Sequence, residues 1–380
     1  MSNPIPVTNP KQGYLSLKSD ILAAVERVLD SGWYILGQEV SNFEAEFAAY
    51  CGASQCIGVA NGTDAIVLAL KSLGVGAGDA VFTVSHTAVA TVAAIELTGA
   101  TPVLVDVDAG TYTLDPQKLK DSIVAVTAEG KLTPKAVVGV HLYGHPFDIP
   151  AISSICREHG LFLVEDCAQA HGATFEGRHV GTFGDAGTFS FYPTKNLPAF
   201  GDGGGVIFRD ARAAETCRAL REYGWRERYL SDLAGQNSRL DELQAAILRV
   251  RLQHLDEEIA TRRAAAEIYG EGLKDMVTVP TLRPGVAHAY HLYVIQSDKR
   301  DALKNALGGA GVGTGIHYPV PVHLQKAYEG RVPLGAGGTD ATEGLTDRIL
   351  SLPMHGFLSR EDATSVVEAV RQWHEKPQDG

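Results

Sequence analysis

Short runs of β-branched and apolar residues alternate with segments of helical periodicity from about residue 41 to residue 208. This alternation predicts an α/β fold, with a mostly parallel, mixed sheet flanked by helices. Ligands of such sheets bind at the carboxyl ends of the strands, so polar residues just beyond a strand are the first candidates for a site. The expected strands cover residues 55–60, 80–85, 101–107, 136–142, 161–165, 187–191 and 204–208, and the last two are expected to pair in an antiparallel or mixed way.

Local signals predict where the first two helices begin and end. Residues 41–44 (Ser-Asn-Phe-Glu) form a capping-box pattern that predicts the start of a helix, and Gly52 can end it. Residues 61–64 (Asn-Gly-Thr-Asp) follow an expected strand directly and lead into a helix over 65–73, which Gly74 stops. The segment therefore predicts a strand, turn and helix unit.

The character of the chain changes beyond about residue 241. Residues 241–269 are charged and amphipathic, and they predict one long helix that connects two domains. A strand-like segment at 291–295 and a loop at 315–323 follow it. We therefore expect a large domain over residues 1–250 and a smaller α+β domain over residues 251–380.

Composition narrows the class of protein. The 380 residues are 45% hydrophobic and carry a net charge of -12, which argues against a nucleic-acid-binding protein. No apolar run is long enough for a membrane span, and the first residues do not resemble a signal peptide. The five cysteines form no CxxC pair, which suits reduced thiols. We expect a soluble, cytoplasmic protein that binds no membrane.

Lys195 and Asp166 are the most informative pair of residues. Asp166 ends an apolar strand, and Lys195 lies farther along the chain, just before a glycine-rich stretch at 201–205. Pyridoxal phosphate needs an amine for a Schiff base with its aldehyde and a carboxylate that keeps its ring nitrogen protonated. The two residues are candidates for those roles, although an aspartate at this position could also cap a helix.

Other polar residues follow the expected strands. Gly62 and Thr63 can direct N–H groups and a hydroxyl at a phosphate, or can simply cap the helix. Ser190 could add a hydroxyl to the same phosphate. His86 follows the strand at 80–85 and could stack on a cofactor ring, or serve only a structural role. Gln169 could meet the phenolic oxygen of the cofactor. The 13 histidines form no HExxH pair, so we expect no catalytic metal.

Four motifs in this order resemble the nucleotide-sugar aminotransferases, a family of fold-type I pyridoxal-phosphate enzymes. They are Asn-Gly-Thr-Asp at 61–64, Glu-Asp-Cys-Ala-Gln-Ala-His at 165–171, Ser-Phe-Tyr-Pro-Thr-Lys-Asn at 190–196, and Gly-Gln-Asn-Ser-Arg-Leu-Asp-Glu-Leu-Gln-Ala-Ala at 235–246. The resemblance covers nearly the whole chain. It implies the fold-type I architecture with a large cofactor-binding domain and a smaller C-terminal domain.

The resemblance also implies the role of each site residue. Lys195 would form the Schiff base and move the proton, and Asp166 would pair with the ring nitrogen. Asn237 would reach the phosphate of the neighbouring subunit, which implies a homodimer with shared active sites. The remaining implied contacts are Gly62, Thr63 and Ser190 with the phosphate, Gln169 with the ring hydroxyl, and His86 with the ring face.

Two further segments, 220–229 and 315–325, resemble the branch that aminates C3 of a dTDP-linked 3-keto-6-deoxyhexose, with L-glutamate as the amino donor. Tyr318 and His323 would then approach the sugar, although a packed aromatic loop also explains them. The alternatives are a 4-aminotransferase acting on 4-keto nucleotide sugars and a non-enzymatic sugar-sensing regulator. A dehydratase of this scaffold is disfavoured, because such relatives have histidine where this chain has Lys195.

Overall fold

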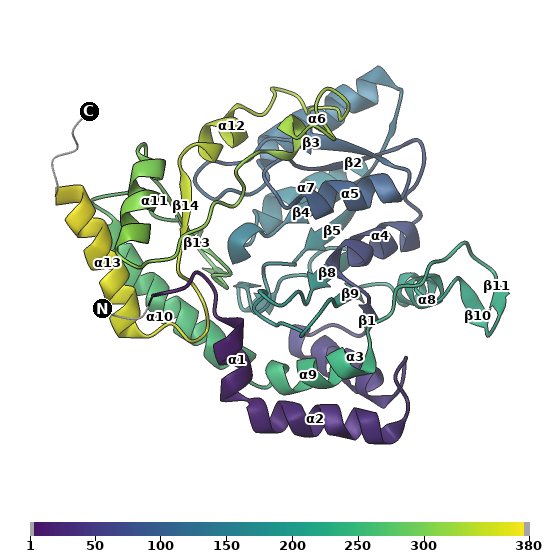
Figure 1. Ribbon diagram of the computed structural model, residues 1–380. Coiled ribbons are helices and arrows are strands. Elements are labelled where there is room, and N and C mark those ends of the chain that lie inside the picture. Colours follow the sequence, from purple (N-terminus) through teal and green to yellow (C-terminus); the bar gives the residue numbers. More distant parts are fainter. Residues whose placement is uncertain (1–3, 376–380) are drawn as a thin grey trace.

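The computed structural model describes residues 4–375 and has a seven-stranded sheet at its centre (Figure 1). The strands are β1 (Cys56–Val59), β2 (Asp79–Val84), β3 (Thr101–Val105), β4 (Thr133–Val140), β5 (Phe162–Asp166), β8 (Ala186–Ser190) and β9 (Gly204–Phe208). Their order is β1-β9-β8-β5-β4-β2-β3. β9 is antiparallel to both of its neighbours, and the other pairs are parallel. The predicted α/β fold with a mostly parallel, mixed sheet is therefore confirmed.

Side chains of the large sheet point alternately to its two faces, and a separate hydrophobic core lies on each face. Phe82 and Val137 contribute to one core, whereas their neighbours Val81 and Val138 contribute to the other. Helices contribute to each core. They are α3 (Gln38–Cys51), α6 (Pro116–Glu129), α7 (Ile149–His159) and α9 (Glu242–Leu252) for the first, and α4 (Gly62–Ser72), α5 (Val89–Leu97) and α8 (Ala211–Leu220) for the second.

A third core lies in a smaller unit beside the sheet (Figure 1). It packs around a two-stranded antiparallel sheet. Ile5 joins this unit through a parallel bridge to Val312, so the first described residues pack with the C-terminal half of the chain. The division at residue 250 stays a prediction. The elements of the unit are α10 (Leu255–Leu273), β13 (Tyr293–Gln296), α11 (Arg300–Gly309), β14 (Ile349–Leu352) and α13 (Arg360–Glu375).

The remaining elements are short or lie at the periphery. A two-stranded hairpin projects from the body of the molecule beyond α8 (Figure 1). Within residues 4–375, no helix combines the length and the apolar character needed to cross a bilayer. These elements are α1 (Pro10–Ser16), α2 (Lys18–Ser31), η1 (Leu142–Gly144), β6 (Thr174–Phe175), β7 (Arg178–His179), β10 (Trp225–Glu227), β11 (Leu230–Ser231), β12 (Val286–Ala287), η2 (Val322–Leu324) and α12 (Asp340–Thr346).

The prediction of one helix over residues 241–269 is wrong. The chain breaks at His254 into α9 and α10, with φ -108° and ψ 0° at that residue. Arg249 and Arg251 lie in the last turn of α9, and three acidic residues lie in the first turn of α10. Positive charge at a helix C-terminus and negative charge at a helix N-terminus both favour separate helices over a continuous one.

The predicted capping box at residues 41–44 is also wrong. α3 begins at Gln38, so Ser41 already lies inside it. The N-terminus is capped from a distant element, because the Glu242 carboxylate accepts hydrogen bonds from the backbone N–H groups of Gly37, Glu39 and Val40 at 2.8–2.9 Å. A long-range cap of this kind leaves no local signal in the sequence.

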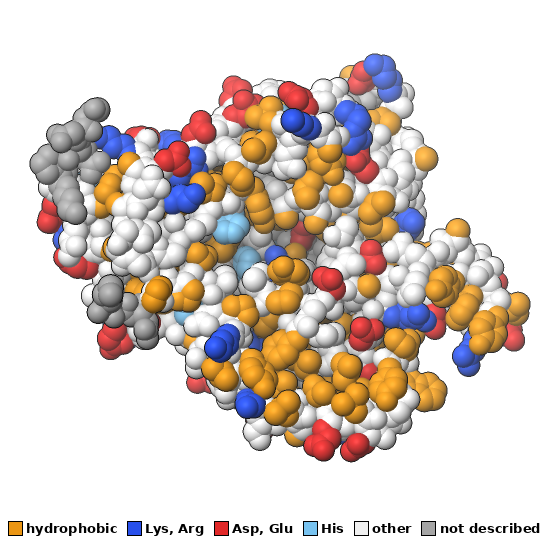
Figure 2. Space-filling model, in the orientation of Figure 1, with side chains coloured by type: hydrophobic (Ala, Val, Ile, Leu, Met, Phe, Trp, Pro, Cys, Tyr) orange, Lys and Arg blue, Asp and Glu red, His pale blue; other side chains and the backbone are white. Residues whose placement is uncertain are grey.

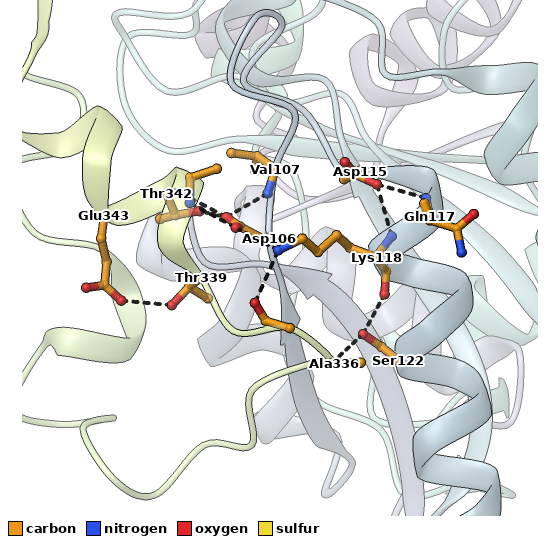
Figure 3. Close-up of polar contacts among 12 residues, drawn as sticks. Asp106, Val107, Asp115, Gln117, Lys118, Ser122, Ala336, Thr339, Thr342 and Glu343 are labelled. Atoms are coloured by element: carbon orange, nitrogen blue, oxygen red, sulfur yellow. Dashed lines mark hydrogen bonds and ion pairs between the residues drawn. The ribbon is translucent and has the colours of Figure 1, made fainter.

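Asp106, just beyond β3, ties the N-terminal turn of α12 to the large sheet (Figure 3). Its carboxylate accepts hydrogen bonds from the backbone N–H groups of Ala341 and Thr342 at 3.0 and 2.9 Å, and from the Thr342 hydroxyl at 2.8 Å. Burial raises the pKa of Asp106, but these hydrogen bonds outweigh burial, so the net pKa lies below its usual value. The carboxylate is thus charged in the folded state.

Replacement of Asp106 with asparagine is expected to lower the free energy of unfolding by about 2 kcal/mol at neutral pH, because charge-assisted hydrogen bonds are lost. A carboxylate with a lowered pKa stabilises the fold fully above its unfolded value of 3.8, and this contribution disappears as the pH falls through the folded pKa. Urea unfolding should therefore show a difference that shrinks below pH 3.8. Asp121→Asn, at an exposed position, is the control. A difference independent of pH would contradict this account.

Candidate active site

A cavity of about 310 Å³ lies at the carboxyl edge of the large sheet. Its volume falls within the roughly 300–1,000 Å³ of small-molecule sites. The cavity brings together six residues singled out from the sequence, which are Gly62, Thr63, Asp166, Gln169, Ser190 and Lys195. Figure 2 shows this face of the molecule, with a central hollow between the smaller unit and the sheet.

Lys195 lies in a turn after β8 that the backbone holds in place. The Lys195 N–H donates to the Tyr192 carbonyl at 2.8 Å, and the Ala199 N–H donates to the Phe191 carbonyl at 2.7 Å. The next residue, Asn196, donates through its side chain to the Ala289 carbonyl at 3.0 Å. Burial of the amine lowers the pKa of Lys195 to about 8, against the opposing field of Asp166. A neutral amine is therefore accessible near physiological pH.

Asp166 ends β5 and is buried. Its carboxylate accepts hydrogen bonds from the Thr91 hydroxyl at 2.9 Å and from the Ala168 N–H at 3.1 Å. Burial nevertheless raises the pKa of Asp166, although these two bonds and the field of Lys195 lower it. A cationic partner would favour the ionised form of a carboxylate buried in this way.

The N-terminus of α4 meets the end of β8 beside the cavity. The Asn61 side chain caps the helix by accepting a hydrogen bond from the Asp64 N–H at 2.8 Å. Gly62 packs so closely on Ser190 that a β-carbon on Gly62 would lie 2.6 Å from the Ser190 β-carbon. The predicted start of this helix at residue 65 is three residues late, because Asn61 provides the cap. Gly62, Thr63 and Ser190 thus line the cavity together, at the N-terminus of a helix, where an anion is favoured.

Gln169 connects the cavity to the loop that begins at Tyr318. Its side-chain oxygen accepts a hydrogen bond from the Tyr143 N–H at 2.7 Å, and its amide nitrogen donates to the Tyr318 hydroxyl at 3.0 Å. Burial raises the pKa of Tyr318 to about 12, so the phenol is neutral. Tyr318 does not line the cavity itself but the neighbouring groove.

Besides Tyr318, three of the residues singled out from the sequence lie outside the cavity lining. His86 is buried behind it, and its Nε2 lies 2.7 Å from the Tyr143 hydroxyl. His323 is also buried, with Nδ1 2.7 Å from the Ser85 hydroxyl. Asn237 is exposed on the segment that follows β11. The roles of these three residues stay predictions.

Sequence reasoning missed two residues that organise the site. Thr91, in α5, holds one oxygen of Asp166, and Tyr143 links His86 to Gln169. Neither belongs to a recognisable motif. Their only signal is position, because Thr91 follows β2 closely and Tyr143 follows β4, at the carboxyl edge where ligands bind.

Glu165, beside Asp166, does not line the cavity. Its carboxylate accepts hydrogen bonds from the N–H groups of Gly181, Phe183 and Gly184 at 2.7–2.8 Å, and lies 2.9 Å from His141 Nε2. These bonds fasten the loop before β8 to β5. The alternation of the strand therefore places one acid in the scaffold and the next in the cavity.

The lysine after β8 and the aspartate at the end of β5 thus line one cavity at the carboxyl edge of the sheet. The model of the DegT/DnrJ/EryC1/StrS aminotransferase family matches residues 15–371, so the chain belongs to this family. The fold-level expectation and the expected enzyme class are confirmed.

Individual relatives extend over almost the full chain. The dTDP-3-amino-3,4,6-trideoxy-alpha-D-glucose transaminase of Streptomyces venezuelae is 44% identical, over 98% of this chain and 97% of that protein. The erythromycin biosynthesis sensory transduction protein EryC1 of Saccharopolyspora erythraea is 46% identical, over 97% and 99%. The crystal structure of S. venezuelae DesV with a ketimine intermediate superimposes with a TM-score of 0.93 at 44% identity, covering 99% of this chain and 100% of that one.

Proposed function

We propose that this protein is a pyridoxal-phosphate-dependent aminotransferase that moves the amino group of L-glutamate to C3 of a dTDP-linked 3-keto-6-deoxyhexose. The observation that carries the proposal is that Lys195, Asp166 and the Gly62–Ser190 contact surround one cavity. The similarity to the dTDP-3-amino-3,4,6-trideoxy-alpha-D-glucose transaminase of Streptomyces venezuelae supports this class of substrate.

The residues of the cavity fit pyridoxal phosphate. The raised pKa of Asp166 reflects a buried carboxylate without sufficient positive charge around it, and a protonated ring nitrogen would supply that charge. The close approach of Gly62 and Ser190, at the N-terminus of α4, suits a phosphate dianion. When bound, the cofactor supplies an aldehyde and an electron-accepting ring.

Each residue then has a defined task. The Lys195 amine, whose pKa is lowered by burial, would hold the cofactor through its aldehyde and would act as the general base toward the proton of the amino donor. Asp166 keeps the ring nitrogen protonated, and Thr91 orients that carboxylate. The Gln169 side chain, held by the Tyr143 N–H, would contact the ring hydroxyl.

We include a homodimer with shared sites in the proposal. Asn237 is exposed and does not line the cavity of its own chain, so it is free to serve a neighbouring one. Exposed aromatic side chains support a contact with a second copy, since Trp33, Tyr223 and Tyr229 have 64%, 40% and 71% of their surface exposed. We also propose that the protein works in the cytoplasm. Its five cysteines are buried and form no disulfide, which suits that compartment.

Subunit mixing tests the shared site. Lys195→Ala and Asn237→Ala proteins should each be impaired alone, whereas a refolded equimolar mixture should recover about a quarter of wild-type activity, because half of the dimers are mixed and each holds one intact site. Unmixed samples at the same total concentration are the control. A mixture no more active than the mean of its two components would contradict a site shared between subunits.

Product analysis tests the reaction itself. The protein is incubated with glutamate and a panel of 3-keto and 4-keto dTDP-sugars, and the products are identified by mass spectrometry and NMR. We expect an amino group at C3 and formation of 2-oxoglutarate. Amination of 4-keto sugars alone would overturn the assignment to C3. Failure of every sugar, together with failure of glutamate to change the cofactor spectrum, would favour the sugar-sensing regulator.

A further inference from the structure

A second, smaller cavity also has Lys195 in its lining. It has a volume of about 50 Å³, and Lys195 is the one described residue that it shares with the larger cavity. Its other walls come from residues 8–13, α9, α10 and residues 355–357. Since a water molecule needs about 10–15 Å³ of such volume, the smaller cavity has room for a chloride-sized ion or a carboxylate group, but not for a sugar.

The described lining of the smaller cavity has more positive than negative charge. Arg251 and Arg262 both line it and are buried, with 4% and 5% of their surface exposed. Guanidinium groups stay protonated in proteins. Glu258 is the one acidic side chain of this lining, and one of its oxygens lies 2.9 Å from an Arg251 nitrogen. One carboxylate therefore faces two guanidinium groups, which leaves an excess of at least one positive charge.

Arg262 is the cation that lacks a counter-ion. Within residues 4–375 it forms no ion pair, and its Nη1 donates to the carbonyls of Tyr290 and Met354 at 3.1 and 3.2 Å. Its Nε has no hydrogen-bond partner among these residues. Burial lowers the pKa of Arg262 to about 10, although the field of Glu258 opposes this shift. A guanidinium buried in this way is costly without an anion beside it.

His355 adds a neutral donor to the same cavity. It is buried, and neither of its ring nitrogens has a hydrogen-bond partner in the described part of the chain. Burial and the field of Arg262 lower the pKa of His355 to about 4, so the imidazole is neutral and has one N–H to donate. Water molecules would satisfy this group but would not balance the charge of Arg262. The cavity therefore favours an anion over water.

We propose that the smaller cavity binds one small monovalent anion, of the size of chloride or of a carboxylate group, between Arg262 and His355. The anion comes either from solution or from the amino donor, and only the second source rests on the proposed function. Because Lys195 lines the same cavity, an anion there stabilises the ammonium form of Lys195. Bound chloride should therefore shift the reactivity of this amine to higher pH.

Bromide and chloride binding to the cofactor-loaded protein test the site directly. Anomalous diffraction from crystals grown in bromide should show one bromide ion between Arg262 and His355. In solution, chloride titrations followed by NMR line width should show affinity weakened at least about tenfold in Arg262→Gln. His355→Phe, which keeps the guanidinium, should also weaken binding, and Arg212→Gln, at an exposed position on α8, is the matched control. Only water in the cavity, with equal line widths for all four proteins, would overturn the proposal.

Kinetic measurements identify the source of the anion. Covalent binding of pyridoxal phosphate to the cofactor-free protein should level off at a higher pH in chloride than in gluconate, which is too large for the cavity, and Arg262→Gln should remove this difference. Chloride that raises the KM for glutamate without lowering the rate at saturation assigns the cavity to a donor carboxylate, whereas an unchanged KM assigns it to free chloride. Failure of the wild-type protein to convert glutamate would overturn the proposed function and would leave a bromide ion in the cavity unaffected.

Discussion

Replacement of Lys195 with alanine is expected to reduce transamination at least about 10⁴-fold, because the same amine binds the aldehyde and moves the proton. The substitution removes no hydrogen bond of the backbone turn, since the Lys195 N–H to Tyr192 contact and the Asn196 contact do not involve the lysine side chain. The variant should therefore keep its circular dichroism spectrum and thermal midpoint. Steady-state product formation is the measurement.

A control variant and a pH dependence accompany this test. Lys304→Ala removes an exposed lysine on α11 and should leave activity unchanged. In addition, the wild-type protein freed of cofactor should bind pyridoxal phosphate covalently at a rate that rises with pH and levels off above about 8, because the lowered pKa of Lys195 makes the neutral amine available there. Retention of even a few per cent of wild-type activity by Lys195→Ala would reject the assigned role.

Replacement of Asp166 with asparagine is expected to lower transamination about 10³-fold while Lys195 still binds the cofactor. Asparagine keeps the size of the side chain and an oxygen for the Thr91 hydroxyl, so the change isolates the negative charge. Thr91→Val, which only releases the carboxylate, should have a smaller effect, about tenfold. Single-turnover absorbance measurements with glutamate give the rate constants.

The thermal stability of the Asp166→Asn variant provides an independent test of the role of Asp166. Burial raises its pKa above the usual 3.8, so the folded state binds the proton more tightly than the unfolded state does. By linkage, the ionised carboxylate destabilises the cofactor-free protein as the pH rises through that range. Asp166→Asn should therefore raise the thermal midpoint of the cofactor-free protein at neutral pH. A lower midpoint together with near-normal turnover would show that Asp166 is a structural residue.

The sequence was sufficient to predict the strands of the large sheet and the position of the candidate site. Strands of a buried sheet have a strong apolar signal, and Lys195 and Asp166 each follow or end such a strand. Strand order brings the two into one cavity, because β5 and β8 are neighbours. The fold class and the family resemblance are confirmed, whereas the individual contacts with cofactor and sugar stay predictions.

What sequence reasoning missed depends on contacts between distant segments. Glu242 caps α3 across about two hundred residues of chain, and Thr91 orients Asp166 from another helix. The groove beside the cavity also forms only when Val89 and Val320 approach each other from separate elements. The break at His254 is different, because the charges on either side of it were visible in the sequence.

Reduction with borohydride tests the central claim most directly. Treatment of the purified, cofactor-loaded protein fixes the Schiff base as a stable bond, and proteolysis with mass spectrometry then identifies the modified lysine. The account predicts one pyridoxyl group per chain, on Lys195, and none when the protein is first incubated with glutamate. A pyridoxyl group on another lysine, or no modification of Lys195 at full cofactor loading, would contradict it.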